Sequence, residues 1–105
     1  MIVQFHWLLK LLKSRGIPIF GFLILILDKN NHQDILHEKI HLRQQWETLI
    51  IFWYIIYLIE WIYKWIKIGK LWDAYYQIKF EREAFTEEIY PDYLKDRKLF
   101  NWIKY

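Results

Sequence analysis

Two histidines and a glutamate in the segment His37-Glu38-Lys39-Ile40-His41 have the types and spacing needed for metal chemistry. On a helix, residues four apart lie on one side about one turn apart, so His37 and His41 can reach one ion. Imidazole nitrogens bind zinc at about 2.0–2.1 Å. Glu38 can then hydrogen-bond a water at the open coordination position and take its proton as the water attacks a carbonyl. The pattern predicts a zinc site with Glu38 as general base; the alternative is a solvated helix face.

A third protein ligand must come from a carboxylate further along the chain. The sequence has no cysteine, and its two other histidines, His6 and His32, lie upstream of the pair. Downstream, the segment Phe80-Glu81-Arg82-Glu83-Ala84 offers two carboxylates. These are about 200° apart around a helix, so both cannot easily face one metal ion. Spacing alone leaves both Glu81 and Glu83 as candidates.

The two segments together resemble the gluzincin group of metallopeptidases. In that group the third zinc ligand is a glutamate in the pattern E-x-x-A on a later helix, and Glu81-Arg82-Glu83-Ala84 matches it. The resemblance implies that Glu81 is the ligand, and the small Ala84 allows two helices to approach closely. From about Ile17 to Arg97 the chain also looks like small Bacteroidetes proteins with the same H-E-x-x-H motif. These are similar to minimal gluzincins and, more distantly, to membrane-embedded zinc proteases of the prenyl-protein-protease type.

One position departs from the larger membrane proteases. They usually carry an acidic residue after the alanine, where this chain has Phe85. Such a carboxylate would orient a zinc-bound histidine, so another residue has to do this or the function is absent. Gln44, Gln45 and Thr48 continue the histidine face and could support the site, or form a polar seam between helices.

The elements that must position these residues indicate a mainly α fold in one domain, residues 1–105. The segment 33–68 contains no glycine or proline and predicts one long helix, with Asn31 as its N-cap. We expect this helix to pack antiparallel against a second helix, 72–90. The remaining segments are predicted as an interfacial helix (1–13), a short apolar strand or extended segment (17–27), and a tail with at most a short helix (91–105).

The composition predicts contact with a membrane. The chain is 55% hydrophobic and 21% aromatic, more apolar surface than 105 residues can bury. Trp46 to Ile66 has about the length of a bilayer span, and a tilted span or a helix in one leaflet fits it. Lysines beside the apolar stretches suit anionic lipid headgroups. An obligate homo-oligomer is the alternative, and the absence of a recognised motif argues against nucleic-acid binding.

We therefore expect a zinc-dependent metallopeptidase, associated with a bacterial inner membrane, that hydrolyses a peptide or protein substrate. His37, His41 and Glu81 would be the metal ligands and Glu38 the catalytic base. The apolar segment 17–27 would align the substrate as an edge strand. The alternative is a non-enzymatic membrane protein whose zinc site is structural or vestigial, because a chain of 105 residues has little material for a substrate pocket.

Overall fold

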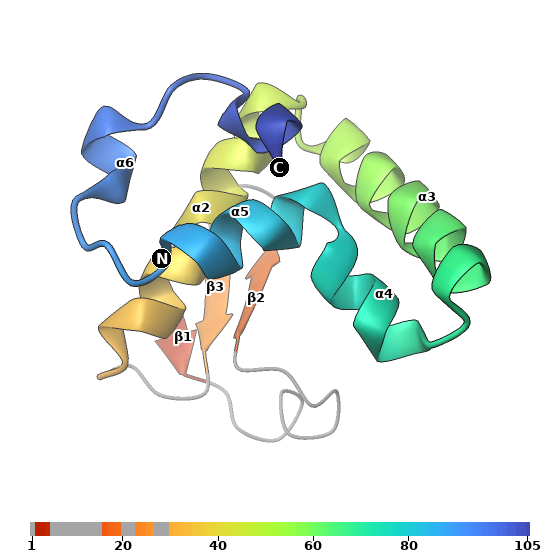
Figure 1. Ribbon diagram of the computed structural model, residues 1–105. Coiled ribbons are helices and arrows are strands. Elements are labelled where there is room, and N and C mark those ends of the chain that lie inside the picture. Colours follow the sequence, from red (N-terminus) through yellow and green to blue (C-terminus); the bar gives the residue numbers. More distant parts are fainter. Residues whose placement is uncertain (1, 5–15, 20–22, 27–29) are drawn as a thin grey trace.

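The computed structural model describes residues 2–4, 16–19, 23–26 and 30–105, and within them the protein is mainly helical (Figure 1). The mainly α fold predicted from the sequence is thus confirmed. The elements in chain order are β1 (Ile2–Gln4), β2 (Gly16–Ile19), β3 (Leu23–Ile26), α2 (His32–Glu47), α3 (Ile51–Ile68), α4 (Leu71–Gln77), α5 (Lys79–Glu87), α6 (Tyr93–Asp96) and a 3-10 helix, η1 (Asn101–Lys104).

The three strands form a small sheet in the order β1-β3-β2. β1 is parallel to β3, and β2 is antiparallel to it with Ile17 opposite Leu25. Within the predicted extended segment 17–27, residues 17–19 and 23–26 therefore form paired strands, because pairing satisfies backbone groups that a lone strand leaves unpaired. Residues 20–22 and 27 lie outside the described residues. The predicted interfacial helix 1–13 is wrong for residues 2–4, where the β-branched Ile2 and Val3 pair with β3; residues 5–13 lie outside the described residues.

The prediction of one long helix over 33–68 is wrong, because α2 ends at Glu47 and α3 begins at Ile51. The axes of α2 and α3 differ by 110°. Leu49 and Ile50 link them with positive φ of 57° and 64°, values that cost such residues about 1–3 kcal/mol each. The turn brings Trp53, 4% exposed, back onto α2, where its indole Nε1 donates to Gln44 Oε1 at 3.2 Å. Burial of this large side chain offsets the strain, and no glycine or proline marks the break.

The second predicted helix, 72–90, is also divided. It forms α4 and α5 on either side of Ile78, which is extended (φ −63°, ψ 132°) and fully buried. The backbone N–H of Lys79, the first residue of α5, donates to Glu60 Oε1 at 3.1 Å, so a side chain of α3 satisfies this helix start. Gly69 ends α3, in the left-handed conformation with φ 86°.

The predicted antiparallel packing is found between α2 and α5. Gln33, near the start of α2, bonds Glu88 just past the end of α5, whereas Gln44 bonds the carbonyl of Phe80 at the α5 start. Ala84 is fully buried with Leu36 and Ile40 between the two helices, as its small size predicts. A second cluster of Trp53, Ile78 and Phe80 joins α3 to the α4–α5 corner.

Within the described ranges, no single helix is long and apolar enough to cross a bilayer. The α2–α3 pair passes the same test of length and composition only when joined across its 110° bend. The tilted span predicted for 46–66 is therefore not one helix, because the break at Leu49 and Ile50 falls inside it.

Candidate metal centre

Helix α2 places both motif histidines on the side that faces α5. Its start is capped as predicted, since Asn31 Oδ1 accepts from the backbone N–H of Asp34 at 3.0 Å. His37 and His41 are 4% and 1% exposed, and their ring centroids lie 4.8 Å apart at an interplanar angle of 82°. Both imidazoles are thus held inside the protein with their Nε2 atoms toward α5.

Glu81 meets the two histidines from α5. Its Oε1 lies 3.0 Å from His37 Nε2 and 3.0 Å from His41 Nε2. Ligand atoms around a tetrahedral zinc ion are about 3.3 Å apart, given metal–ligand lengths near 2.0–2.2 Å. Both distances to Glu81 Oε1 are therefore a few tenths of an ångström shorter than the spacing of ligand atoms around a zinc ion.

The Nδ1 atoms of both histidines also have hydrogen-bond partners. His37 Nδ1 contacts Glu88 Oε2 at 2.9 Å, and His41 Nδ1 contacts Gln44 Oε1 at 2.9 Å. In the neutral tautomer with the proton on Nδ1, these contacts leave both Nε2 lone pairs for a metal ion. Gln44 was among the residues expected to support the site.

The orienting carboxylate was missed in the sequence. Phe85, which stands where the larger membrane proteases have an acidic residue, packs its ring edge-on against His37 with centroids 4.4 Å apart. Glu88 supplies the carboxylate from two helical turns beyond Glu81, a spacing that returns to the same side of a helix. That seven-residue spacing was the available signal.

Glu38 lies beside the histidines and is 5% exposed. Its Oε2 has no hydrogen-bond partner among the described residues. Burial raises the pKa of Glu38 to about 7, against the opposing influence of His41 and His37. One ligand atom from each of His37, Glu38 and His41 lies within 4.8 Å of the others, so this buried group could hold a metal ion.

The charges around the two histidines are strongly coupled. Burial lowers the pKa of His37, but hydrogen bonds to Glu81 and Glu88 outweigh it and raise the value to about 10. For Glu81, burial raises the pKa, but the charge of His41 and hydrogen bonds from both imidazoles bring it well below its usual range. A proton on each imidazole thus balances the surrounding carboxylates, a role that a cation could also fill.

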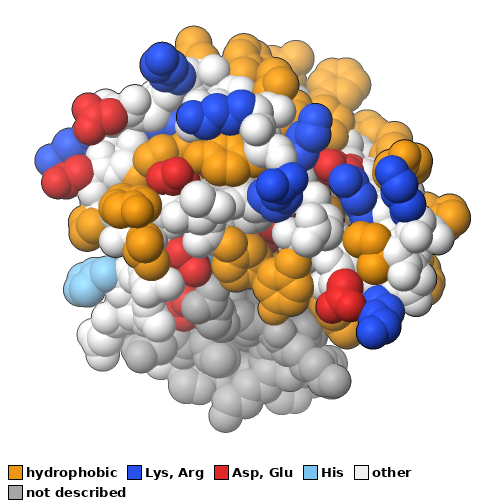
Figure 2. Space-filling view, viewed as in Figure 1, with side chains coloured by type: hydrophobic (Ala, Val, Ile, Leu, Met, Phe, Trp, Pro, Cys, Tyr) orange, Lys and Arg blue, Asp and Glu red, His pale blue; other side chains and the backbone are white. Residues whose placement is uncertain are grey.

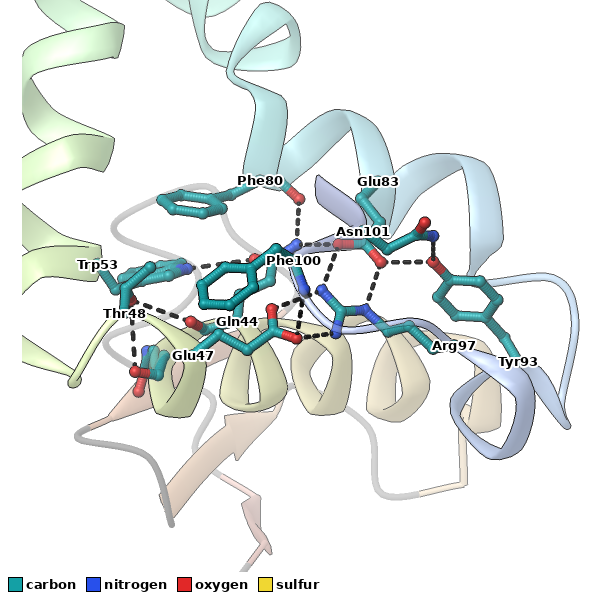
Figure 3. A network of polar contacts seen from close by, with 11 residues as sticks. Gln44, Glu47, Thr48, Trp53, Phe80, Glu83, Tyr93, Arg97, Phe100 and Asn101 are labelled. Atoms are coloured by element: carbon teal, nitrogen blue, oxygen red, sulfur yellow. Dashed lines mark hydrogen bonds and ion pairs between the residues drawn. The ribbon is translucent and has the colours of Figure 1, made fainter. Parts of the chain in front are cut away.

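Glu83, the other candidate ligand, belongs to a different network (Figure 3). Its carboxylate accepts from Arg97 Nε, Tyr93 Oη and Gln44 Nε2, the last at 2.8 Å. Arg97 also binds Glu47 with two hydrogen bonds of 2.7 and 3.0 Å. The structure therefore places Glu81, and not Glu83, beside the histidines, while Glu83 anchors the C-terminal segment.

A cavity of about 230 Å³ opens at the cluster and is lined on one side by Glu38, His41 and Glu81. The remaining lining residues come from β2, α3 and α4 and are Gly16, Ile17, Pro18, Trp53, Tyr54, Tyr57 and Tyr75. Tyr57 was not singled out in the sequence, and its hydroxyl donates to Glu81 Oε2. Burial raises its pKa well above the usual value, so the phenol stays protonated.

His32, the upstream histidine that the structure describes, does not join the cluster. His32 is the exposed first residue of α2, and His6 lies outside the described residues.

No family model, curated protein or solved structure matches this chain. The resemblance to gluzincins therefore stays a prediction, and the assignment of a function depends on the geometry of the site.

Proposed function

We propose that this chain is a zinc-dependent hydrolase of the metallopeptidase type. His37, His41 and Glu81 would hold the metal, and Glu38 would be the general base. The observation that carries the proposal is the convergence of two Nε2 atoms on one oxygen of Glu81, each at 3.0 Å, with both Nδ1 atoms held from behind.

The donor set suits zinc. Two imidazoles and one carboxylate are a known catalytic zinc ligand set, which leaves one coordination position for water or substrate. Burial of Glu81 and Glu88, at 3% and 6% exposure beside the two imidazoles, supports a bound cation, because buried carboxylates need compensating charge. The buried Glu38 Oε2, without a partner among the described residues, fits a base that engages a ligand molecule.

Zinc at this position would make a bound water more acidic and polarise a substrate carbonyl. Glu38 would accept the water proton on its carboxylate and later donate it to the leaving amine. Burial raises the pKa of Glu38 above its ordinary value, which makes its carboxylate a stronger base. Tyr57 would hold Glu81 in place through its hydroxyl.

The surroundings support an extended substrate with an apolar side chain. β2 is an edge strand of the sheet, and Gly16, Ile17 and Pro18 line the cavity. An extended peptide would add beside this edge strand in place of the contact between the Tyr54 hydroxyl and the Pro18 carbonyl. The aromatic rings of Trp53 and Tyr54 form apolar walls of the same cavity.

A structural zinc site is the second candidate. It is favoured by the near-complete burial of both histidines and Glu81, at 4%, 1% and 3% exposure. A structural site is normally closed by four protein ligands. Glu38, which is grouped with the histidines, would then be the fourth ligand rather than a base.

Metal analysis with two kinds of variant tests the proposal. The purified full chain should contain one equivalent of zinc, which His37→Ala and Glu81→Ala should lose. Glu38→Gln should retain zinc but lose at least about 100-fold in cleavage of a mixed peptide library. Glu87→Gln, on the same helix as Glu81, is the matched control.

Two results would contradict the proposal. Folded protein without affinity for zinc would remove the metal site altogether. Loss of zinc in Glu38→Gln, without peptide cleavage by the zinc-loaded wild type, would assign Glu38 as a fourth ligand and the site as structural.

A further inference from the structure

Helix α3 turns a continuous apolar face away from the other described elements. Figure 2 shows hydrophobic side chains gathered on the upper right, over α3. Six side chains that define this face are between 45% and 79% exposed: Phe52, Ile55, Leu58, Ile59, Ile62 and Ile66. We call these six residues the outer face of α3. At about 100° per residue they cover an arc of about 120°, a single continuous side of the helix.

The charged residues of α3 lie on the opposite side. Glu60, Lys64 and Lys67 are the three charged residues of this helix, and they fall within an arc of about 60°. Glu60 and Lys64 are half-buried, and Glu60 accepts from the backbone N–H of Lys79. A helix on a water-exposed surface has the reverse arrangement, with its charged side outward. The outer face of α3 therefore requires an apolar cover.

We propose that the outer face of α3 inserts into the interfacial region of a lipid bilayer that contains anionic lipids. An apolar arc opposite a basic polar side is the pattern of a helix that lies in the membrane plane. Lys67 and Lys70 are exposed at the C-terminal end of the helix, where they can reach anionic headgroups. Trp65 and Trp72, 46% and 48% exposed, lie at the same end, as aromatic residues do at a membrane interface.

Charge favours lipid over a second copy of the chain as the cover. The single acidic residue of α3 is Glu60, which is turned inward and hydrogen-bonded to the start of α5. Two copies packed through α3 would therefore offer no α3 carboxylate to the exposed Lys67 of the other copy. Anionic headgroups provide a negative partner for Lys67 without the burial of an unpaired charge.

This arrangement has a consequence for the candidate metal centre. Tyr54 and Tyr57, on the inward side of α3, line the cavity beside Glu38 and Glu81. With its outer face in lipid, α3 would separate the cavity from the membrane by roughly one helix diameter, about 10 Å. The lipid contact itself does not depend on the presence of zinc.

Flotation with lipid vesicles tests the inference. The full chain should float with vesicles of phosphatidylcholine and phosphatidylglycerol, and less with phosphatidylcholine alone. The double variant Ile59→Gln/Ile66→Gln should bind at least about tenfold more weakly, because two apolar side chains leave the lipid. The matched control is Ile89→Gln/Leu99→Gln, which changes side chains that are 58% and 75% exposed but lie outside α3.

Three outcomes would overturn the inference. The first is a folded wild-type protein that floats with neither vesicle composition. The second is equal flotation of the α3 double variant and the wild type, which would place any lipid contact elsewhere. The third is a wild-type dimer, measured by analytical ultracentrifugation, that the α3 double variant converts to a monomer. That result would assign the outer face to a second copy of the chain.

Discussion

Glu88 Oε2 lies 2.9 Å from His37 Nδ1, so the orienting carboxylate for this histidine comes from just beyond the end of α5. The same α5 region thus contacts both ring nitrogens of His37, through Glu81 on one side and Glu88 on the other. Relative rotation of α2 and α5 would change both contacts together. Metal affinity should therefore depend on Glu88 although its carboxylate lies on the far side of the imidazole.

Replacement of Glu88 should weaken zinc binding without removal of a ligand. Glu88→Ala is expected to lose about 10–100-fold in zinc affinity, since the imidazole is no longer held in its ligating orientation. Glu88→Gln should lose less, because its amide oxygen can still accept from Nδ1–H. Competition with a chromogenic chelator measures both, with Glu87→Gln as the control. Unchanged affinity in Glu88→Ala would assign this contact a role in packing only.

Zinc binding should release protons and strengthen as the pH rises. Hydrogen bonds to Glu81 and Glu88, which outweigh the effect of burial, raise the pKa of His37 from 6.5 to about 10, so the ring is protonated at neutral pH before the metal binds. The metal requires the neutral imidazole. Calorimetric titrations in buffers of different ionisation enthalpy measure the number of protons released. A zinc affinity that is constant between pH 6 and 8 would contradict this expectation.

The raised pKa of His37 should make the zinc-free protein less stable as the pH rises, whereas zinc affinity should increase. A raised pKa of His37 contributes stability that is fully present below its unfolded value of 6.5 and is lost as the pH rises through about 10. Urea denaturation of chelator-treated protein at several pH values measures this trend. The trend should weaken in His37→Gln, which removes the titrating group.

Among the residues of the C-terminal segment, replacement of Arg97 should lower the free energy of unfolding the most. Its side chain is 1% exposed and paired with Glu47 and Glu83, which are 3% and 0% exposed. Arg97→Met leaves two buried carboxylates without their partner and is expected to destabilise the fold by about 3–5 kcal/mol. Lys95→Met is the control, because Lys95 pairs with Asp92 at 78% exposure and should contribute little. Equal denaturation midpoints for the two variants would refute the structural role of Arg97.

The strained corner between α2 and α3 should tolerate glycine. Leu49 has φ 57° and is 72% exposed, so Leu49→Gly relieves strain with little loss of packing. We expect the free energy of unfolding to stay equal or rise by up to about 1 kcal/mol. Lys39→Gly, at an exposed position inside α2, should instead lose about 1 kcal/mol. A comparable loss in both variants would mean that Leu49 is not strained.

The sequence by itself determined the features that depend on local geometry. The four-residue spacing of His37 and His41 puts both on one side of any helix, and Asn31 caps the helix that carries them. The mainly α fold and the antiparallel approach of the Ala84 helix were predicted in the same way. Each of these depends on neighbours in the chain, or on the size of one side chain, and needs no knowledge of the tertiary structure.

Tertiary packing decided what local rules left open. Glu81 and Glu83 are both on α5, and spacing leaves both open. The tertiary structure pairs Glu83 with Arg97, fourteen residues later, and brings Glu81 to the histidines. The break at Leu49 has no glycine or proline to announce it, because it results from burial of Trp53 against Gln44. Non-local contacts outweigh helix propensity here, since burial of one large aromatic side chain stabilises by more than a few residues of propensity.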